Sequence, residues 1–257
     1  KPAVLYAHGI GPVKRACNRL LVRLVANRAA QVSVRDEASL AELVAMGVTR
    51  PPVEVTADPA FLLSPAEKAE NKNKRPVFAV AVRPGAGEEK YLPEIAAAAD
   101  RLQAKYGAEL VLLPMHPACD LPATRRLAGM LQAKAAVLSE IPEPEKLLDR
   151  FAGFDLVISL RLHALIFAAI CGVPMVGIGY DPKVDAFLRL LELDVAGDTL
   201  TVQADYICRQ AEERLAAGQA LREELLAKRE MLRRQAEGTL GRLAAVLFES
   251  GEEHNRA

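Results

Sequence analysis

The sequence alternates short, uninterrupted apolar runs with longer segments in which apolar residues recur at helical spacing. An apolar run without polar alternation is typical of a strand in a parallel sheet that is buried on both faces. Such runs predict strands at residues 3–7, 31–34, 53–57, 77–82, 109–115, 136–138, 155–159 and 175–178. Because these strands alternate with helical segments, the predicted fold class is α/β with parallel sheets.

The segments between the strands have the apolar spacing of amphipathic helices. We expect helices at residues 13–28, 38–46, 92–106, 122–134, 144–151, 162–171 and 183–191. Gly47, Gly107 and Gly172 follow three of them as stop signals. Residues 202–248 predict further helix, with breaks at Gly218 and Gly238. Basic and acidic residues are mixed there, which indicates a solvated helix face.

A polar segment at residues 64–76 carries no apolar periodicity, and we interpret it as the linker between two lobes. We expect residues 1–70 to form the C-terminal part of a first Rossmann-like lobe, residues 76–201 a second lobe, and residues 202–257 a C-terminal helical segment. The second lobe has enough strands for a doubly wound sheet. The first has few, and the chain opens with Lys-Pro instead of Met, so we expect this lobe to be incomplete.

The composition argues against several classes of function. Lys plus Arg and Asp plus Glu both number 33, and Trp is absent, so neither net charge nor aromatic content favours nucleic-acid binding. The four cysteines have no C-x-x-C spacing, which favours a reducing cytoplasm and argues against zinc. No apolar run approaches the roughly 20 residues that cross a bilayer. We expect a cytoplasmic protein without metal or cofactor, with peripheral contact at the inner membrane face.

Arg161 and His163 directly follow the apolar run at residues 155–159 and open an apolar helical segment. In an open parallel sheet, ligands gather beyond the carboxyl ends of the strands, where helix N-termini attract anions. Arginine adds a permanent charge, and histidine exchanges protons near neutral pH. This segment therefore predicts an anion site that contains an acid–base group.

Polar residues also follow other strands: His8, Arg35, Asp36, Asp58, Arg83 and His116. Any one of them alone has an ordinary structural explanation, but arginine and histidine recurring at one sheet edge predict a shared cleft. Asp36 is equally suited to cap the helix that follows it. Gly9 and Gly11 serve backbone geometry or the close approach of a ligand.

Five motifs carry a family resemblance: Gly9-Ile-Gly11-Pro12, the segment 33–39 (SVRDEAS), Asp58-Pro-Ala-Phe61, Pro114-Met-His116 with Asp120 beyond it, and Ser159-Leu-Arg161-Leu-His163-Ala164. In order and spacing they are similar to the motifs of the polysaccharide pyruvyl transferases. The likeness is strongest to the bacterial CsaB type, which places a pyruvate ketal on a secondary cell-wall polysaccharide precursor. It spans most of residues 3–200.

The resemblance implies a GT-B-like fold, with two Rossmann-like lobes and a C-terminal helix that crosses back to the first. Members usually carry a Gly-Asp-Glu segment near their N-terminus, and this chain has none. The implied reaction takes phosphoenolpyruvate, attaches its three-carbon unit to two hydroxyls of one sugar as a cyclic ketal, and releases phosphate. The implied acceptor is a lipid-linked aminosugar disaccharide or polysaccharide precursor.

The same resemblance implies roles for individual residues. His163 is the implied acid–base group, and Arg161 lies beside it at the catalytic edge. The implied donor-binding residues are Arg35, Arg83, Arg161 and His116. Supporting roles fall to His8, Gly9, Gly11, Asp36, Asp58 and Asp181, the last two by orienting an arginine across the cleft.

Two other classes remain open. A nucleotide-sugar glycosyltransferase or epimerase of GT-B type would share the fold, but it would need an acidic residue after a Gly-rich turn late in the second lobe, which residues 176–181 match only weakly. A non-catalytic sugar-phosphate binding module would need the cations without the acid–base group.

Overall fold

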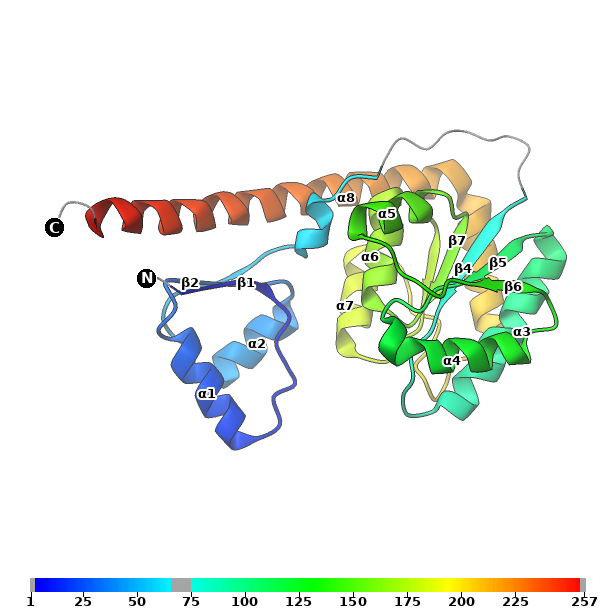
Figure 1. The fold of residues 1–257 in the computed structure, drawn as a ribbon, viewed down its shortest axis with the longest axis horizontal. Coiled ribbons are helices and arrows are strands. Elements are labelled where there is room, and N and C mark those ends of the chain that lie inside the picture. The colour runs from blue at the N-terminus through cyan, green and yellow to red at the C-terminus, as the bar shows by residue number, and fades with distance from the viewer. Residues whose placement is uncertain (1–2, 66–74, 255–257) are drawn as a thin grey trace. The chain divides into compact units, whose positions relative to one another are not determined.

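The structure, a computed structural model, describes residues 3–65 and 75–254 (Figure 1). The chain divides into two compact units. The first comprises Lys1–Leu62 with Arg229–Ala257, and the second comprises Leu63–Lys228. Most of the predicted linker, residues 66–74, lies outside the described residues.

The described part of the first unit contains a three-stranded parallel sheet in the order β1-β2-β3. Its elements are β1 (Val4–His8), α1 (Ala16–Ala26), β2 (Gln31–Val34), α2 (Glu37–Ala45), β3 (Val53–Val55) and the short 3-10 helix η1 (Pro59–Leu62). A small apolar core of Val32, Val34 and Leu43 holds the sheet against its helices. The predicted strands of this lobe are therefore present and parallel.

The described part of the second unit contains a five-stranded parallel sheet in the order β6-β5-β4-β7-β8. Its elements are β4 (Val77–Ala81), α3 (Glu88–Tyr106), β5 (Glu109–Leu112), α4 (Pro117–Met130), β6 (Ala135–Val137), α5 (Pro144–Ala152), β7 (Leu156–Ser159), α6 (Leu162–Cys171), β8 (Met175–Gly177) and α7 (Pro182–Leu190). Helices α3 and α4 cover one face, and α5, α6 and α7 cover the other (Figure 1). This double winding buries β4 and β7 completely, as their unbroken apolar runs predict.

The strand order reverses between β4 and β7, because the chain runs from β4 through β5 to β6 on one side and then returns to place β7 on the other. Such a switch point leaves a crevice outside the carboxyl ends of the two strands, where ligands bind in doubly wound folds. Arg83 follows β4 and Arg161 follows β7, so both lie at this edge.

The long helix α8 (Ala204–His254) contributes to both units. Its backbone leaves the helical conformation at Gly218, at φ 54° and ψ −121°, which confirms the predicted break there. The predicted break at Gly238 is wrong. The next residue, Thr239, is fully buried and its Oγ1 lies 2.8 Å from Oγ1 of Thr56, so packing outweighs the cost of about 1 kcal/mol for a helical glycine.

Two helices begin four or five residues earlier than the sequence predicts. Helix α3 begins at Glu88 and α4 at Pro117, and both carry an internal proline, Pro93 and Pro122. Proline is favoured in the first turn of a helix, so the two prolines led to predicted helix starts at residues 92 and 122, which are too late. In the described residues, no helix is long and apolar enough to span a membrane.

Candidate functional site

The side chain of Arg161 is held by a buried carboxylate. Its Nε donates to Oδ2 of Asp120 at 3.0 Å, and its Nη2 donates to Oδ1 of the same group. Asp120 is fully buried in the first turn of α4, whereas the Arg161 side chain is 22% exposed. A bidentate pair of this kind combines charge with fixed geometry. Arg161 is therefore positioned before any ligand arrives.

Three further hydrogen bonds hold this pair in place. The backbone N–H of His116 donates to Oδ2 of Asp120 at 2.9 Å, and the hydroxyl of Thr124 donates to the backbone carbonyl of Asp120 at 2.9 Å. On the other side, the backbone N–H of Arg161 donates to Oγ of Ser159 at 2.7 Å. The exits of β5 and β7 are thus tied to each other through one carboxylate.

The pairing leaves part of the guanidinium group to face a ligand. Asp120 contacts the edge formed by Nε and Nη2, so the end formed by Nη1 and Nη2 keeps N–H donors that can bind a second anion. Arg161 is also the N-cap residue of α6, and its side chain does not cap that helix. The first N–H groups of α6 therefore add to the attraction for an anion.

His116, Arg161 and His163 line one pocket of about 330 Å³ in the second unit. His116 is the N-cap residue of α4, and His163 lies in the first turn of α6. Both histidines are exposed, so His163 lies outside the apolar core. The other lining residues are mainly apolar: Met115, Ile141, Pro142, Pro144, Leu147 and Phe167. Apolar walls around a few convergent polar groups are typical of small-molecule sites.

Arg83 lies at the same sheet edge but does not line this pocket. Its guanidinium stacks on the ring of Tyr180, with 4.1 Å between Cζ and the ring centroid. Its Nε is buried and has no hydrogen-bond partner among the described residues. The hydroxyl of Tyr91 donates to the backbone carbonyl of Arg83 at 2.5 Å, and burial raises the pKa of Tyr91 to about 12. Arg83 is thus fixed in place with one donor unsatisfied.

A second group of the predicted residues gathers in the first unit around Arg35. Its Nη1 contacts Oδ2 of Asp58 at 2.8 Å, so Asp58 orients an arginine of its own unit. A Cβ atom at Gly9 would lie 2.6 Å from Nε of Arg35, so only glycine leaves room for this guanidinium. Nε of Arg35 and the hydroxyl of Tyr6 are both buried without a hydrogen-bond partner among the described residues. Burial first, and then the Asp58 carboxylate, raise the pKa of Tyr6.

Other predicted site residues have structural roles in the fold. Asp36 caps α2 by accepting from the N–H of Ser39 at 2.6 Å. Asp181 caps α7 by accepting from the N–H of Lys183 at 3.0 Å. Gly11 has a φ of +92°, which glycine adopts readily. His8 is exposed at the end of β1, and its carbonyl accepts from the N–H of Arg35 at 3.3 Å.

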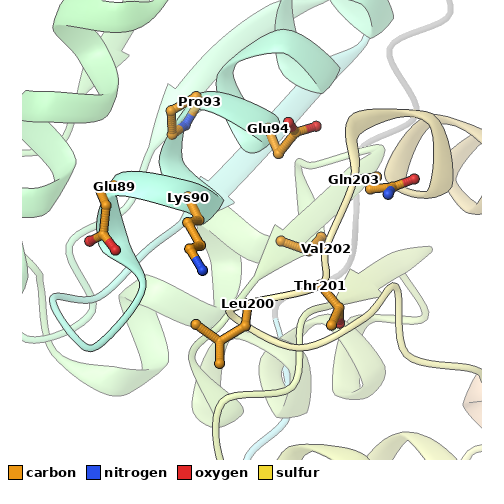
Figure 2. Close-up of a pocket in the computed structure, with 8 residues that line it drawn as sticks. All are labelled: Glu89, Lys90, Pro93, Glu94, Leu200, Thr201, Val202 and Gln203. Atoms are coloured by element: carbon orange, nitrogen blue, oxygen red, sulfur yellow. The ribbon is translucent and has the colours of Figure 1, made fainter.

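A second pocket of about 500 Å³ lies in the second unit, beside the start of α3 (Figure 2). None of the predicted site residues lines it; the lining residues are Glu89, Lys90, Pro93, Glu94, Leu200, Thr201, Val202 and Gln203. Its two carboxylates outnumber its single cation, and Glu94 already accepts from the N–H of Ala204 at 2.7 Å. This pocket is therefore less suited to an anionic ligand than the one beside Arg161.

Sequence reasoning did not identify Asp120 as the partner of Arg161. An acidic residue near the start of a helix is ordinarily explained by the helix dipole, and the predicted helix began only at residue 122. Ser159 and Tyr180 were likewise not assigned contacts. Two signals for Asp120 were available: its place in the motif that begins at Pro114, and its spacing of four residues after His116, which becomes one helical turn only when α4 begins at Pro117.

Comparison with known proteins gives fold and family. The pattern of the polysaccharide pyruvyl transferase family matches residues 1–182. No curated protein matched the sequence. Among solved structures, the chain is similar to a Listeria monocytogenes protein described as a UDP-N-acetylglucosamine 2-epimerase, with TM-score 0.69 and 13% identity over 98% of this chain and 69% of that one.

Two further structures show the same likeness. They are MnaA of S. aureus, solved with UDP (TM-score 0.67, 14% identity, 96% of this chain and 69% of that one), and HepE of Anabaena, solved with UDP-glucose (TM-score 0.62, 15% identity, 97% and 72%). At these identities the likeness shows the fold alone, and the fold is GT-B, with Rossmann-like units and C-terminal helix as predicted. With the family pattern matched over most of its length, the chain belongs to the polysaccharide pyruvyl transferase family and is a transferase.

Proposed function

We propose that the protein transfers the pyruvyl group of phosphoenolpyruvate to a sugar of a cell-wall polysaccharide precursor, forming a cyclic ketal and releasing phosphate. The observation that carries this proposal is the pocket in which Arg161, held by Asp120, meets His116 and His163 at the first turn of α6. A fixed cation, a helix N-terminus and acid–base groups in one pocket suit an anionic donor that must be protonated.

The donor carries a phosphate and a carboxylate, and each needs cationic partners of its own. We assign the phosphate to the N-terminus of α6 and the outer end of Arg161, because negative charge grows there as the phosphate departs. Since Asp120 fixes the guanidinium beforehand, little reorganisation is needed in the transition state. Arg83 and Arg35, each held in place with a buried Nε that lacks a partner among the described residues, are our proposed further donor-binding cations.

In the proposed reaction, His163 in its protonated form gives a proton to carbon 3 of the donor, and positive charge develops at carbon 2. One sugar hydroxyl attacks carbon 2 and loses its proton, the bond from carbon 2 to the phosphate oxygen breaks, and the second hydroxyl closes the ring. Of the two protons that the hydroxyls lose, one restores His163 and the other leaves with phosphate. His116, which lines the same pocket, contacts donor or acceptor.

The acceptor is proposed to be a lipid-linked aminosugar disaccharide or polysaccharide precursor. Structures of the same fold bind UDP and UDP-glucose, which supports a site for a sugar that carries a phosphorylated leaving group or anchor. The same observation favours the alternative function, a nucleotide-sugar glycosyltransferase or epimerase. The two functions differ in the donor that each consumes.

The test is to offer both donors to the full chain. With phosphoenolpyruvate and a diphosphate-linked N-acetylated aminosugar disaccharide, we expect release of phosphate and an acceptor that gains the mass of one pyruvic acid less one water. With UDP-N-acetylglucosamine or UDP-glucose, we expect neither epimerisation nor release of UDP. The reverse pattern would establish the alternative. Arg161→Gln should abolish the first reaction, whereas Gln219→Ala, an exposed change on α8, should leave it unchanged.

A further inference from the structure

Helix α1 presents its large apolar side chains to solvent. Leu20, Leu21, Leu24 and Val25 are 53%, 59%, 42% and 57% exposed, and the buried residue of this helix is Ala26. At 3.6 residues per turn, the four exposed side chains lie within an arc of about 140°. A helix that packs on a sheet in water ordinarily directs this arc toward the core. In α1 the arc is directed away from it.

The charged residues of α1 and of the segments that flank it are all basic. The chain has no Asp or Glu before Asp36, whereas Lys14, Arg15, Arg19, Arg23 and Arg28 lie within or beside α1. Arg19 contacts Glu42 at 2.6 Å. The other four are exposed and have no carboxylate partner among the residues that the structure describes. An apolar face is thus bordered by unneutralised cations.

We propose that α1 is the surface by which this protein binds an anionic lipid bilayer. The helix, about 16 Å long, would lie in the plane of the interface. Leu20, Leu21, Leu24 and Val25 enter the boundary of the acyl chains, and the flanking cations contact lipid phosphates.

Charge complementarity favours lipid over a second copy of the chain. The fully buried part of a protein interface is depleted of charge, whereas this apolar face has cations on its border. In a two-fold dimer built on α1, the same patch would meet itself, and the cations of one copy would oppose those of the other. An anionic bilayer neutralises these cations with its lipid phosphates and also buries the apolar side chains.

The test is co-sedimentation of the full chain with vesicles of phosphatidylglycerol and phosphatidylcholine, compared with vesicles of phosphatidylcholine alone. We expect preferential binding to the anionic vesicles, weakened by salt, because exposed charges are screened. The double variant Leu21→Gln/Val25→Gln should bind at least tenfold more weakly. Since each Lys or Arg near such a surface contributes about fivefold, Lys14→Gln/Arg28→Gln should bind about 25-fold more weakly.

Matched controls replace exposed residues of the second unit. Met130→Gln/Leu190→Gln and Arg125→Gln/Arg150→Gln remove the same numbers of apolar side chains and charges, and both should bind vesicles as the unaltered chain does. All these side chains are exposed, so circular dichroism should show every variant folded.

Four results would overturn the proposal. The first is equal binding to neutral and anionic vesicles, and the second is unaltered binding by either α1 variant. The third is absence of vesicle binding together with a dimer, seen by light scattering, that Leu21→Gln/Val25→Gln converts to monomer; α1 would then be an interface between copies. The fourth is vesicle binding by this chain that disappears in a longer protein containing it, because another segment would then cover α1.

Discussion

Replacing Asp120 with asparagine would remove the carboxylate that holds Arg161 while keeping the size of the side chain. The change affects the two charge-assisted hydrogen bonds that Arg161 donates, each worth about 1.5–3 kcal/mol, and removing one partner of a buried pair costs about 3–5 kcal/mol. The amide can still accept one bond, and Arg161 is 22% exposed, so water replaces part of the loss. We therefore expect the free energy of unfolding to fall by about 2–3 kcal/mol.

The same change should reduce turnover, since Arg161 would no longer be held toward the ligand. If the guanidinium stabilises the departing phosphate, a loss of about 2–3 kcal/mol in transition-state stabilisation lowers kcat/KM for phosphoenolpyruvate by about 30- to 150-fold, mostly in kcat. Steady-state assays of phosphate release measure this, and urea denaturation measures the stability. Asp120→Glu, which keeps the charge, should recover part of the activity.

Thr124→Val provides the control for a purely structural effect. Thr124 is fully buried and donates to the backbone carbonyl of Asp120, so its loss destabilises the same turn of α4 by about 1 kcal/mol but leaves the carboxylate beside Arg161. We expect reduced stability with unchanged kcat/KM. Wild-type kcat/KM in a folded Asp120→Asn variant, or an equal kinetic loss in Thr124→Val, would refute the positioning role of Asp120.

Three further predictions concern other groups. Arg35→Lys keeps the charge but loses the planar fork held by Asp58, so kcat/KM for phosphoenolpyruvate should fall by roughly 1–3 kcal/mol in free-energy terms; unchanged kinetics would leave Arg35 a structural residue. Gly9→Ala should displace the same guanidinium and give a similar kinetic loss, whereas Gly129→Ala, in open space on α4, should only stabilise the fold. Burial raises the pKa of Asp185, so its charged form destabilises the fold above pH 3.8; Asp185→Asn should raise Tm at pH 7 but not at pH 3, and an equal shift at both would contradict this cause.

The fold could be predicted where local pattern and tertiary environment agree. Helix α6 has the predicted bounds, residues 162–171, because an unbroken apolar segment follows a buried strand and ends at Gly172, whose φ of +63° suits glycine. Gly238 shows the opposite case. The low helix propensity of glycine predicts a break there, but the buried contacts of Thr239 keep the helix continuous.

The candidate site, like the fold, could be predicted from sequence only in part. His116 and Arg161 could be placed together from sequence, because parallel strands bring their carboxyl ends to one edge. The contact of Asp120 with Arg161 could not, since it depends on where α4 begins and how it packs beside β7. Likewise, the outward direction of the apolar arc of α1 depends on which face the sheet covers, which spacing alone does not determine.

In the proposed mechanism, His163 protonates carbon 3 of phosphoenolpyruvate in the pocket beside Arg161. The most direct measurement is mass spectrometry and NMR of the pyruvylated acceptor formed in D₂O by the full chain and by His163→Ala. We predict a ketal whose methyl group carries deuterium from solvent, and a rate that falls at least about a hundredfold in the variant, as expected for loss of a general acid. An acceptor that gains no pyruvyl group, or His163→Ala that forms the deuterated ketal at the unaltered rate, would contradict this role of His163.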